Sequence, residues 1–228
     1  SSSYVFYVVK NVSTNLTDFD PILNSWTKSD VTVTFTSNIA TTCRWDYASV
    51  FYTDMPSANE CSGANTTSHS CDVINLVPPQ AAVYLSCIGH LGGNKNLAYY
   101  IDDTAPTDVP AIYDGTENTG VDLDSSTSSV SFSANWEDAT DGESGIDNYW
   151  YSIGSSPGAS DTVSWKSVND TVDSITETGL SLDSGTTYYI SIIAQNPVGD
   201  LSGVTTSDGV LIDADPPFKT NWSPATST

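Results

Sequence analysis

The sequence predicts an all-β chain with two β-sandwich domains in tandem and an extra strand at the N-terminus. Helical periodicity is nearly absent, and short β-branched and aromatic runs recur between clusters of Gly, Pro, Asn, Asp and Ser. The length of 228 residues suffices for two cores of ordinary size. A short acidic phrase ending in proline occurs twice, as IDDTAP from Ile101 and as IDADPP from Ile212. Each copy follows a β-rich stretch, so each predicts the end of a module.

These signals divide the chain into four parts. We expect an N-terminal strand and linker over 1–17, a disulfide-containing sandwich over 18–104, a second sandwich over 105–215 and a trailing linker over 216–228.

The N-terminal strand fits neither sandwich. It is apolar on both faces, which in a strand indicates that both sides are covered, and it consists of Tyr4, Val5, Phe6, Tyr7, Val8 and Val9. Two interpretations compete. The segment is either the last strand of a preceding module or a donor strand that completes the sheet of a neighbouring copy. An unpaired strand of this kind would promote aggregation.

Strands of the first sandwich are expected at 31–37, 41–47, 81–87 and 97–101. In the run VTVTFT, alternation places Val31, Val33 and Phe35 on one face and the threonines on the other, as a half-buried antiparallel strand requires.

Four cysteines fall in this first half, and an even number confined to one module indicates two disulfides formed in an oxidising compartment. Cys43 and Cys87 each end a strand-like run, so the preferred pairing joins these two strands and leaves Cys61 and Cys71 to close a loop. Two other pairings are open. A zinc site is a weaker alternative because the spacings contain no CxxC pair.

The second half resembles a fibronectin type III domain over most of 107–213. Trp136 closes the run VSFSANW, where that family keeps its core Trp. In GLSLDSGTTYYISIIAQNPVG, Leu182, Gly185 and Tyr188 lead into a strand, and the resemblance makes Tyr188 the tyrosine-corner residue. Its strands are expected at 130–136, 148–154, 162–168, 187–196 and 203–212.

The first half resembles the immunoglobulin-like modules found in tandem in microbial surface proteins. The likeness rests on NSWTKSDVTVTFTS, on TTCRWDY and on VYLSCIGHLGGNKN, and it implies the same bridge between Cys43 and Cys87. The segment from Tyr47 to Val77 departs from a compact repeat, and its own two cysteines predict a disulfide-linked excursion.

The net charge is -22, from 6 Lys and Arg against 28 Asp and Glu, and such a field repels nucleic acids and anionic membranes. Adaptation to salty or acidic surroundings is an alternative explanation of the acidity. The longest apolar run, YVFYVV, is too short to span a bilayer. Five Asn-x-Ser/Thr sequons agree with secretion and glycosylation, at Asn11, Asn15, Asn65, Asn169 and Asn221.

A Ca²⁺ site at the junction of the two domains is the strongest chemical expectation. In a fibronectin-like sandwich the loop 137–144 lies at the end where the chain enters, so its carboxylates should face the linker. Hard oxygen ligands on flexible loops suit Ca²⁺. The alternative is that they are solvated carboxylates with turn and capping roles. No cofactor is required by the chain, and the proposed ligands are Asp102, Asp103, Asp138, Asp141 and Glu143.

Consecutive aromatics offer a second site. In a strand, either the pair Tyr149 and Tyr151 or Trp150 alone faces outward, where aromatic rings can stack on sugars or on a neighbouring domain; Trp45 and Trp165 carry the same ambiguity. Catalysis finds little support, since His69 and His90 lie outside any nucleophile or metal motif and are expected in exposed loops.

The sequence therefore predicts a non-catalytic, secreted structural protein of the cell surface: a subunit or repeat segment of a filament, stalk or adhesin. Its expected partners are copies of itself or adjacent repeats, joined in the most specific version by strand donation. The alternative is a carbohydrate-binding module that recognises surface glycans. An accessory domain of a hydrolase is a third, weaker possibility.

Overall fold

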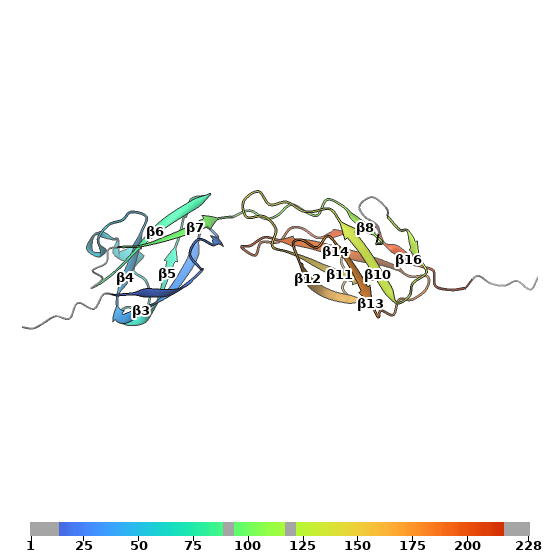
Figure 1. Ribbon diagram of the computed structural model, residues 1–228, viewed down its shortest axis with the longest axis horizontal. Helices are drawn as coiled ribbons and strands as arrows, with labels where there is room; N and C mark the ends of the chain where they lie inside the picture. Colours follow the sequence, from blue (N-terminus) through green and yellow to red (C-terminus); the bar gives the residue numbers. More distant parts are fainter. Residues whose placement is uncertain (1–13, 89–93, 117–121, 217–228) are drawn as a thin grey trace, which may run out of the picture. The chain divides into compact units, whose positions relative to one another are not determined.

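The computed structural model describes residues 14–88, 94–116 and 122–216 (Figure 1). The chain divides into two compact units, residues 1–104 and 105–228, and each is described by itself below. Regular structure in the described ranges is almost entirely β-strand, apart from two 3-10 turns at Tyr52–Asp54 and Ser57–Asn59. No helix within these ranges has the length and apolarity needed to cross a membrane.

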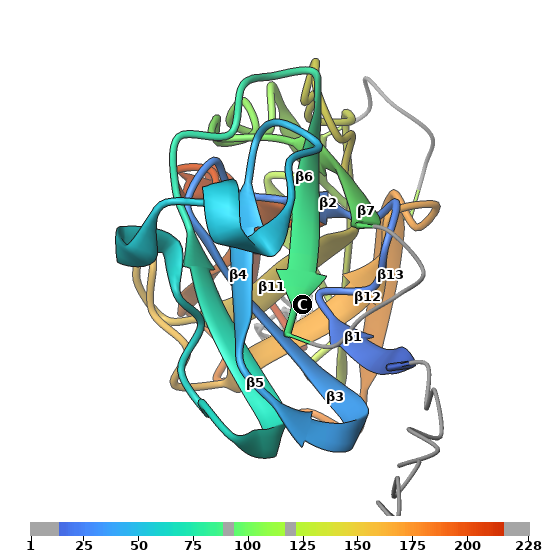
Figure 2. The same ribbon diagram turned by 90° about the vertical axis from the view of Figure 1, so that its left-hand side faces the viewer.

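The first domain is a β-sandwich of a three-stranded and a four-stranded sheet, in the orders β1-β3-β5 and β2-β7-β6-β4. Figure 2 shows β3 and β5 running side by side. Its strands are β1 (Leu16–Asp20), β2 (Trp26–Thr27), β3 (Val31–Thr41), β4 (Cys43–Asp46), β5 (Thr66–Val73), β6 (Gln80–Cys87) and β7 (Lys95–Ile101).

The alternation predicted for β3 is confirmed. Val33 and Phe35 are buried and Val31 is half-buried, whereas Thr32 and Thr34 are exposed. This places the valines and the phenylalanine between the two sheets, where they meet side chains of β6 and β7. The burial of such apolar surface is the main favourable contribution to the stability of the domain.

The segment from Tyr47 to Val77 is only partly the excursion that the sequence predicted. It begins with the two 3-10 turns, but its second half forms β5, which pairs antiparallel with β3 along most of its length. β5 therefore belongs to the core sheet. Cys71 and Val73 of this strand are 2% and 1% exposed.

The second domain is also a sandwich, with sheets in the orders β13-β10-β8 and β12-β11-β14-β16-β9; β15 additionally pairs with β14 (Figure 1). Its strands are β8 (Ile112–Asp114), β9 (Ser125–Ser126), β10 (Ser131–Trp136), β11 (Asn148–Gly154), β12 (Val163–Asn169), β13 (Ser174–Thr178), β14 (Thr187–Gln195), β15 (Thr205–Thr206) and β16 (Val210–Ile212).

The core of this domain has the features that the resemblance implied. Trp136 is 1% exposed, and its ring packs edge-on against Tyr149 at 5.6 Å between centroids. The hydroxyl of Tyr188 accepts a hydrogen bond from the backbone N–H of Asp183 at 3.1 Å, which is a tyrosine corner. The first contact joins the two sheets across one apolar interior, to which the ring of Tyr188 also belongs.

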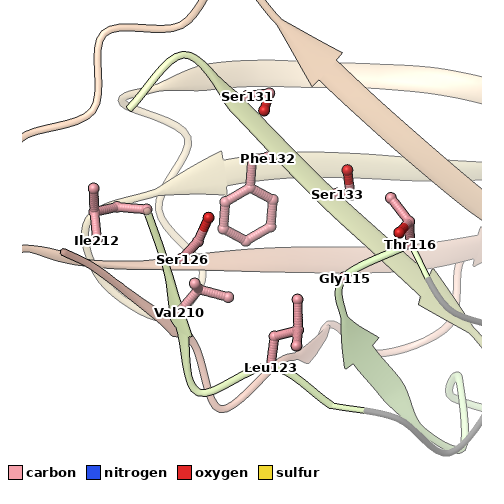
Figure 3. A pocket seen from close by; sticks show the side chains of 9 residues that line it. All are labelled: Gly115, Thr116, Leu123, Ser126, Ser131, Phe132, Ser133, Val210 and Ile212. Atoms are coloured by element: carbon pink, nitrogen blue, oxygen red, sulfur yellow. The ribbon is translucent and has the colours of Figure 1, made fainter. Parts of the chain in front are cut away.

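One edge of the second domain is irregular. β8 pairs antiparallel with β10 in one sheet, whereas β9 pairs parallel with β16 in the other sheet. The chain therefore crosses from one sheet to the other between residues 114 and 125. A cavity of ≈ 180 Å³ lies at this edge, and the side chains of Phe132, Leu123 and Val210 point into it (Figure 3).

Candidate functional site

In β11 the two tyrosines face the core and the tryptophan between them faces outward. Tyr149 and Tyr151 are 1% and 6% exposed and belong to the core. Trp150, between them, is half-buried on the outer face of the sheet. The outward position of Trp150 places a large aromatic ring where a ligand can reach it.

Trp150 lies in a shallow apolar recess on that outer face. Cross-strand pairing places Ile193 of β14 directly beside Trp150, and Trp165 comes from β12 on the other side. The indole N–H of Trp150 donates a hydrogen bond to Oε1 of Gln195 at 2.8 Å, which fixes the orientation of the ring. The recess has a volume of ≈ 240 Å³, and Leu201, 50% exposed, closes its rim.

The remaining tryptophan considered from sequence is not part of a surface site. Trp45 is 5% exposed in the core of the first domain, where it packs edge-on against Tyr47. Of the three, Trp150 and Trp165 therefore form the accessible aromatic surface.

The predicted Ca²⁺ ligands are divided between the two domains. In the first domain, Oδ1 of Asp102 accepts hydrogen bonds from the backbone N–H and the hydroxyl of Thr104 at 2.9 and 3.2 Å. Oδ1 of Asp103 accepts the backbone N–H of Ser29 at 2.9 Å. Asp102, which is 0% exposed, thus caps the turn that follows it, whereas Asp103 holds the backbone of a segment 74 residues earlier in the chain.

In the second domain, the carboxylates of the loop 137–144 also have partners. Oδ1 of Asp141 accepts the backbone N–H groups of Glu143 and Ser144, each at 3.0 Å, and its Oδ2 accepts the side-chain amide of Asn196 at 3.2 Å. The hydroxyl of Tyr149 lies 3.4 Å from Oδ1 of Asp138. A Ca²⁺ site that combines these groups with Asp102 and Asp103 stays a prediction.

A second acidic cluster was missed by the sequence analysis. Carboxylate oxygens of Asp114, Asp122 and Asp208 all lie within 4.8 Å of one another. Asp114 is fully buried, and this desolvation raises its pKa to about 7. Burial likewise raises the pKa of Asp208, and the charge of Asp122 adds to the effect. The local signal was limited to the Asp-Gly pairs at 114–115 and 208–209, which predict turns and do not indicate proximity.

Both predicted disulfides are confirmed. Cys43 and Cys87 are directly opposite each other on β4 and β6, so this bridge joins neighbouring strands of one sheet. Cys61 and Cys71 connect the loop that follows the 3-10 turns to β5. Zinc ligation by these thiols is therefore wrong.

The sequons and the N-terminal strand are only partly within the described ranges. Asn15, Asn65 and Asn169 are exposed, as glycan acceptors must be. Asn11, Asn221 and the segment from Tyr4 to Val9 lie outside the described residues. Glycosylation and strand donation stay predictions.

The expected exposure of His69 is wrong. This residue lies in β5 and is 4% exposed, with its ring stacked on Phe35 at 4.9 Å between centroids. Its Nε2 lies 2.9 Å from the hydroxyl of Ser37, which itself donates to the carbonyl of Ile39 at 2.8 Å. Burial lowers the pKa of His69, because a charged imidazole loses its hydration there. His90 lies outside the described residues.

Comparison with solved structures identifies the same architecture in proteins of low sequence identity. Domains A168–A170 of titin share 16% identity, with 89% of this chain and 67% of that chain covered, at a TM-score of 0.51. Fibronectin(III)-like modules of Clostridium thermocellum CbhA share 11% sequence identity, with 87% of this chain and 94% of that chain covered, at a TM-score of 0.50. The FN1–FN3 domains of chicken CNTN1 share 14% sequence identity, with 84% of this chain and 63% of that chain covered, at a TM-score of 0.50.

No protein-family model and no curated protein sequence matches this chain. At these identities the structural likeness concerns the fold alone. Together with the two sandwiches, the buried Trp136 and the tyrosine corner of Tyr188, it shows that the chain is built of tandem immunoglobulin-like and fibronectin type III-like domains.

Proposed function

We propose that this chain is a non-catalytic structural element of the cell surface, a subunit or repeat segment of an extracellular filament, stalk or adhesin. The observation that carries the proposal is the tandem arrangement of two sandwich domains, of which the first contains two disulfides. Domains of this fold are typical of structural and adhesive proteins, and disulfides form in oxidising compartments.

The chemistry of the surface supports a role in recognition or assembly more than in catalysis. Histidine and cysteine side chains often serve catalysis. Among the described residues, however, His69 is buried in a sheet and the four cysteines are oxidised to disulfides. Exposed Asn15, Asn65 and Asn169 in sequons are consistent with a glycosylated surface protein. The net charge of -22 favours solubility and mutual repulsion of free subunits, so assembly requires a specific contact.

Strand donation by residues 4–9 is the specific contact that we propose. A strand that is apolar on both faces gains main-chain hydrogen bonds and two covered faces when it completes the sheet of another copy. The test compares the full chain with a variant lacking residues 1–12, by light scattering and electron microscopy. We expect multimers or fibres of the full chain and soluble monomers of the truncated chain. Equal assembly of both would contradict strand donation.

A second candidate function is glycan recognition at the recess that contains Trp150 and Trp165. Its apolar floor and fixed indole ring match the requirement of a sugar face for a flat aromatic partner, and Gln195 supplies an amide at its edge.

This candidate predicts retention of the chain on a polysaccharide column. We expect the substitutions Trp150→Ala and Trp165→Ala each to abolish retention, because each removes part of the stacking surface. Phe51→Ala is a matched control, since Phe51 is 80% exposed in the first domain and lies outside the recess. The recess would be rejected as the binding site if the Phe51→Ala control also lost retention, or if the tryptophan variants were retained as the wild type is.

A further inference from the structure

Two neighbouring segments and one that is distant in sequence place carboxylates together at the irregular edge of the second domain. Asp114 ends β8, Asp122 follows on the crossing to β9, and Asp208 lies in the turn before β16. Their carboxylate oxygens lie within 4.8 Å of one another. Two oxygen ligands on opposite sides of a Ca²⁺ ion are separated by about 4.6–5.2 Å, twice the usual bond length, so the spacing matches one shared ion.

The buried member of the cluster is held by directed hydrogen bonds. Asp114 accepts the backbone N–H of Gly209 on Oδ2 at 3.2 Å and the hydroxyl of Ser207. Ser207 is itself fixed, because its hydroxyl oxygen accepts the backbone N–H of Ile190 at 3.2 Å. The Asp114 carboxylate is therefore oriented by the scaffold before any ligand arrives.

The other carboxylate oxygen of Asp114, Oδ1, indicates that a ligand binds here. Asp114 is 0% exposed, yet its Oδ1 has no hydrogen-bond partner within the part of the chain that the structure describes. An unsatisfied buried carboxylate oxygen is unfavourable, since it has lost water without gaining a replacement. A cation at this position would supply the missing interaction.

The two exposed carboxylates are also held close to Asp114. Oδ1 of Asp122 accepts the backbone N–H of Asp114 at 2.7 Å, and the N–H of Leu123 donates to the carbonyl of Asp114 at 3.0 Å. The Leu123 side chain packs directly on Gly115, where an added Cβ would lie 2.8 Å from it. Asp208 completes the cluster, with a carboxylate oxygen within 4.8 Å of those of Asp114 and Asp122. These contacts keep like charges together against their repulsion.

The domain has little positive charge of its own with which to neutralise the cluster. Between residues 105 and 216, outside the gap at 117–121, the only Lys or Arg is Lys166, which pairs with Glu177 at 2.7 Å. The neighbouring cavity is lined by apolar side chains and hydroxyls, including Phe132, Leu123 and Ser133, and none of the described residues in its walls is charged (Figure 3). Among the described residues of this domain, Lys166 is therefore the only cationic side chain, and its partner is Glu177 rather than the cluster.

We propose that Asp114, Asp122 and Asp208 form a Ca²⁺ site that links the end of β8 and the residue Asp122 before β9 to the turn before β16. The donor set is made of hard carboxylate oxygens, one of them buried and oriented and two exposed to water, which suits an ion that accepts six to eight oxygen ligands including solvent. Mg²⁺ fits less well, because it demands strict octahedral geometry at shorter distances. The site is independent of the predicted junction ligands Asp102 and Asp103.

The test uses the full chain, freed of metal with a chelator and titrated with CaCl₂ in a calorimeter at neutral pH and constant ionic strength. We expect binding at the cluster in the wild-type chain and a weakening of roughly tenfold or more in Asp122→Asn and in Asp208→Asn, because each removes a charged ligand. Both side chains are exposed, so these variants should fold. Asp114→Asn should weaken binding most, since its carboxylate is the oriented ligand.

Asp170→Asn is the matched control, because Asp170 is an exposed carboxylate of the same domain outside the cluster. Binding should be unchanged in this control, and circular dichroism in excess chelator should show all variants folded alike. The proposal is overturned if Ca²⁺ does not bind, if the cluster variants bind as the wild type does, or if Asp102→Asn and Asp103→Asn alone abolish binding. A preference for Mg²⁺ over Ca²⁺ would likewise reject the assignment.

Discussion

His69 makes the stability of the first domain dependent on pH. Its imidazole is buried between Phe35 and the hydroxyl of Ser37, and burial lowers its pKa from the ordinary value of 6.5. The hydroxyl of Ser37 already donates to Ile39, so the hydroxyl oxygen accepts from Nε2–H of His69 and the neutral form is the one that fits. Protonation would place a charge in the core.

The sign of the effect follows from linkage. The unfolded chain binds the proton near pH 6.5 and the folded chain only at lower pH, so stability is full above that value and declines as pH falls through the folded pKa. One proton limits the slope to about 1.4 kcal/mol per pH unit. In His69→Phe, which preserves the ring stacking, this contribution should vanish. Urea titrations of both chains between pH 7.5 and 5.5 measure it, and parallel pH profiles would show that the interpretation is wrong.

At the scale of elements, strands were predictable where packing imposes a pattern on the sequence. The runs that became β3, β11 and β14 carry β-branched and aromatic residues at every second position, and the structure places these residues in the cores. Trp136 and Tyr188 were assigned from the resemblance to fibronectin type III domains, and the structure places both in the roles that the resemblance implied.

Strands with polar sequences escaped prediction. β5 reads TTSHSCDV and β13 reads SITET, and neither contains the apolar alternation that identifies a strand. Both form because a neighbour with a strong pattern, β3 or β10, offers them a hydrogen-bonded edge. Their partners are fixed by tertiary contact, so local propensity is overridden.

For the candidate sites too, local sequence patterns predicted some features, and tertiary contacts determined the others. Alternation in β11 predicted that Trp150 faces away from Tyr149 and Tyr151, but which face meets the other sheet depends on the whole sandwich. The cluster around Asp114 was beyond reach, because the turn that contains Asp208 reaches Asp114 only through the fold, where the N–H of Gly209, 95 residues later, donates to the Asp114 carboxylate. β8 and β16 belong to different sheets, so only the packing of the whole sandwich creates that proximity.

For the whole molecule, the distribution of cysteines predicts that the two domains differ in their response to reduction. All four cysteines lie in the first domain, and the second has none. The loop-closure model gives about 4 kcal/mol for the 44-residue separation of Cys43 and Cys87, and about 3 kcal/mol for the 10-residue separation of Cys61 and Cys71. A loss of this size is comparable to the full stability of a small domain.

We therefore expect two unfolding transitions in urea, of which dithiothreitol shifts only one. The paired substitutions Cys43→Ser with Cys87→Ser should lower the midpoint of that transition more than Cys61→Ser with Cys71→Ser, because the first pair closes the longer loop. Since the second domain has no thiol to reduce, its transition is an internal control within the same sample. A single transition that moves as a whole, or a shift of both, would mean that the stability of the second domain depends on the folded state of the first.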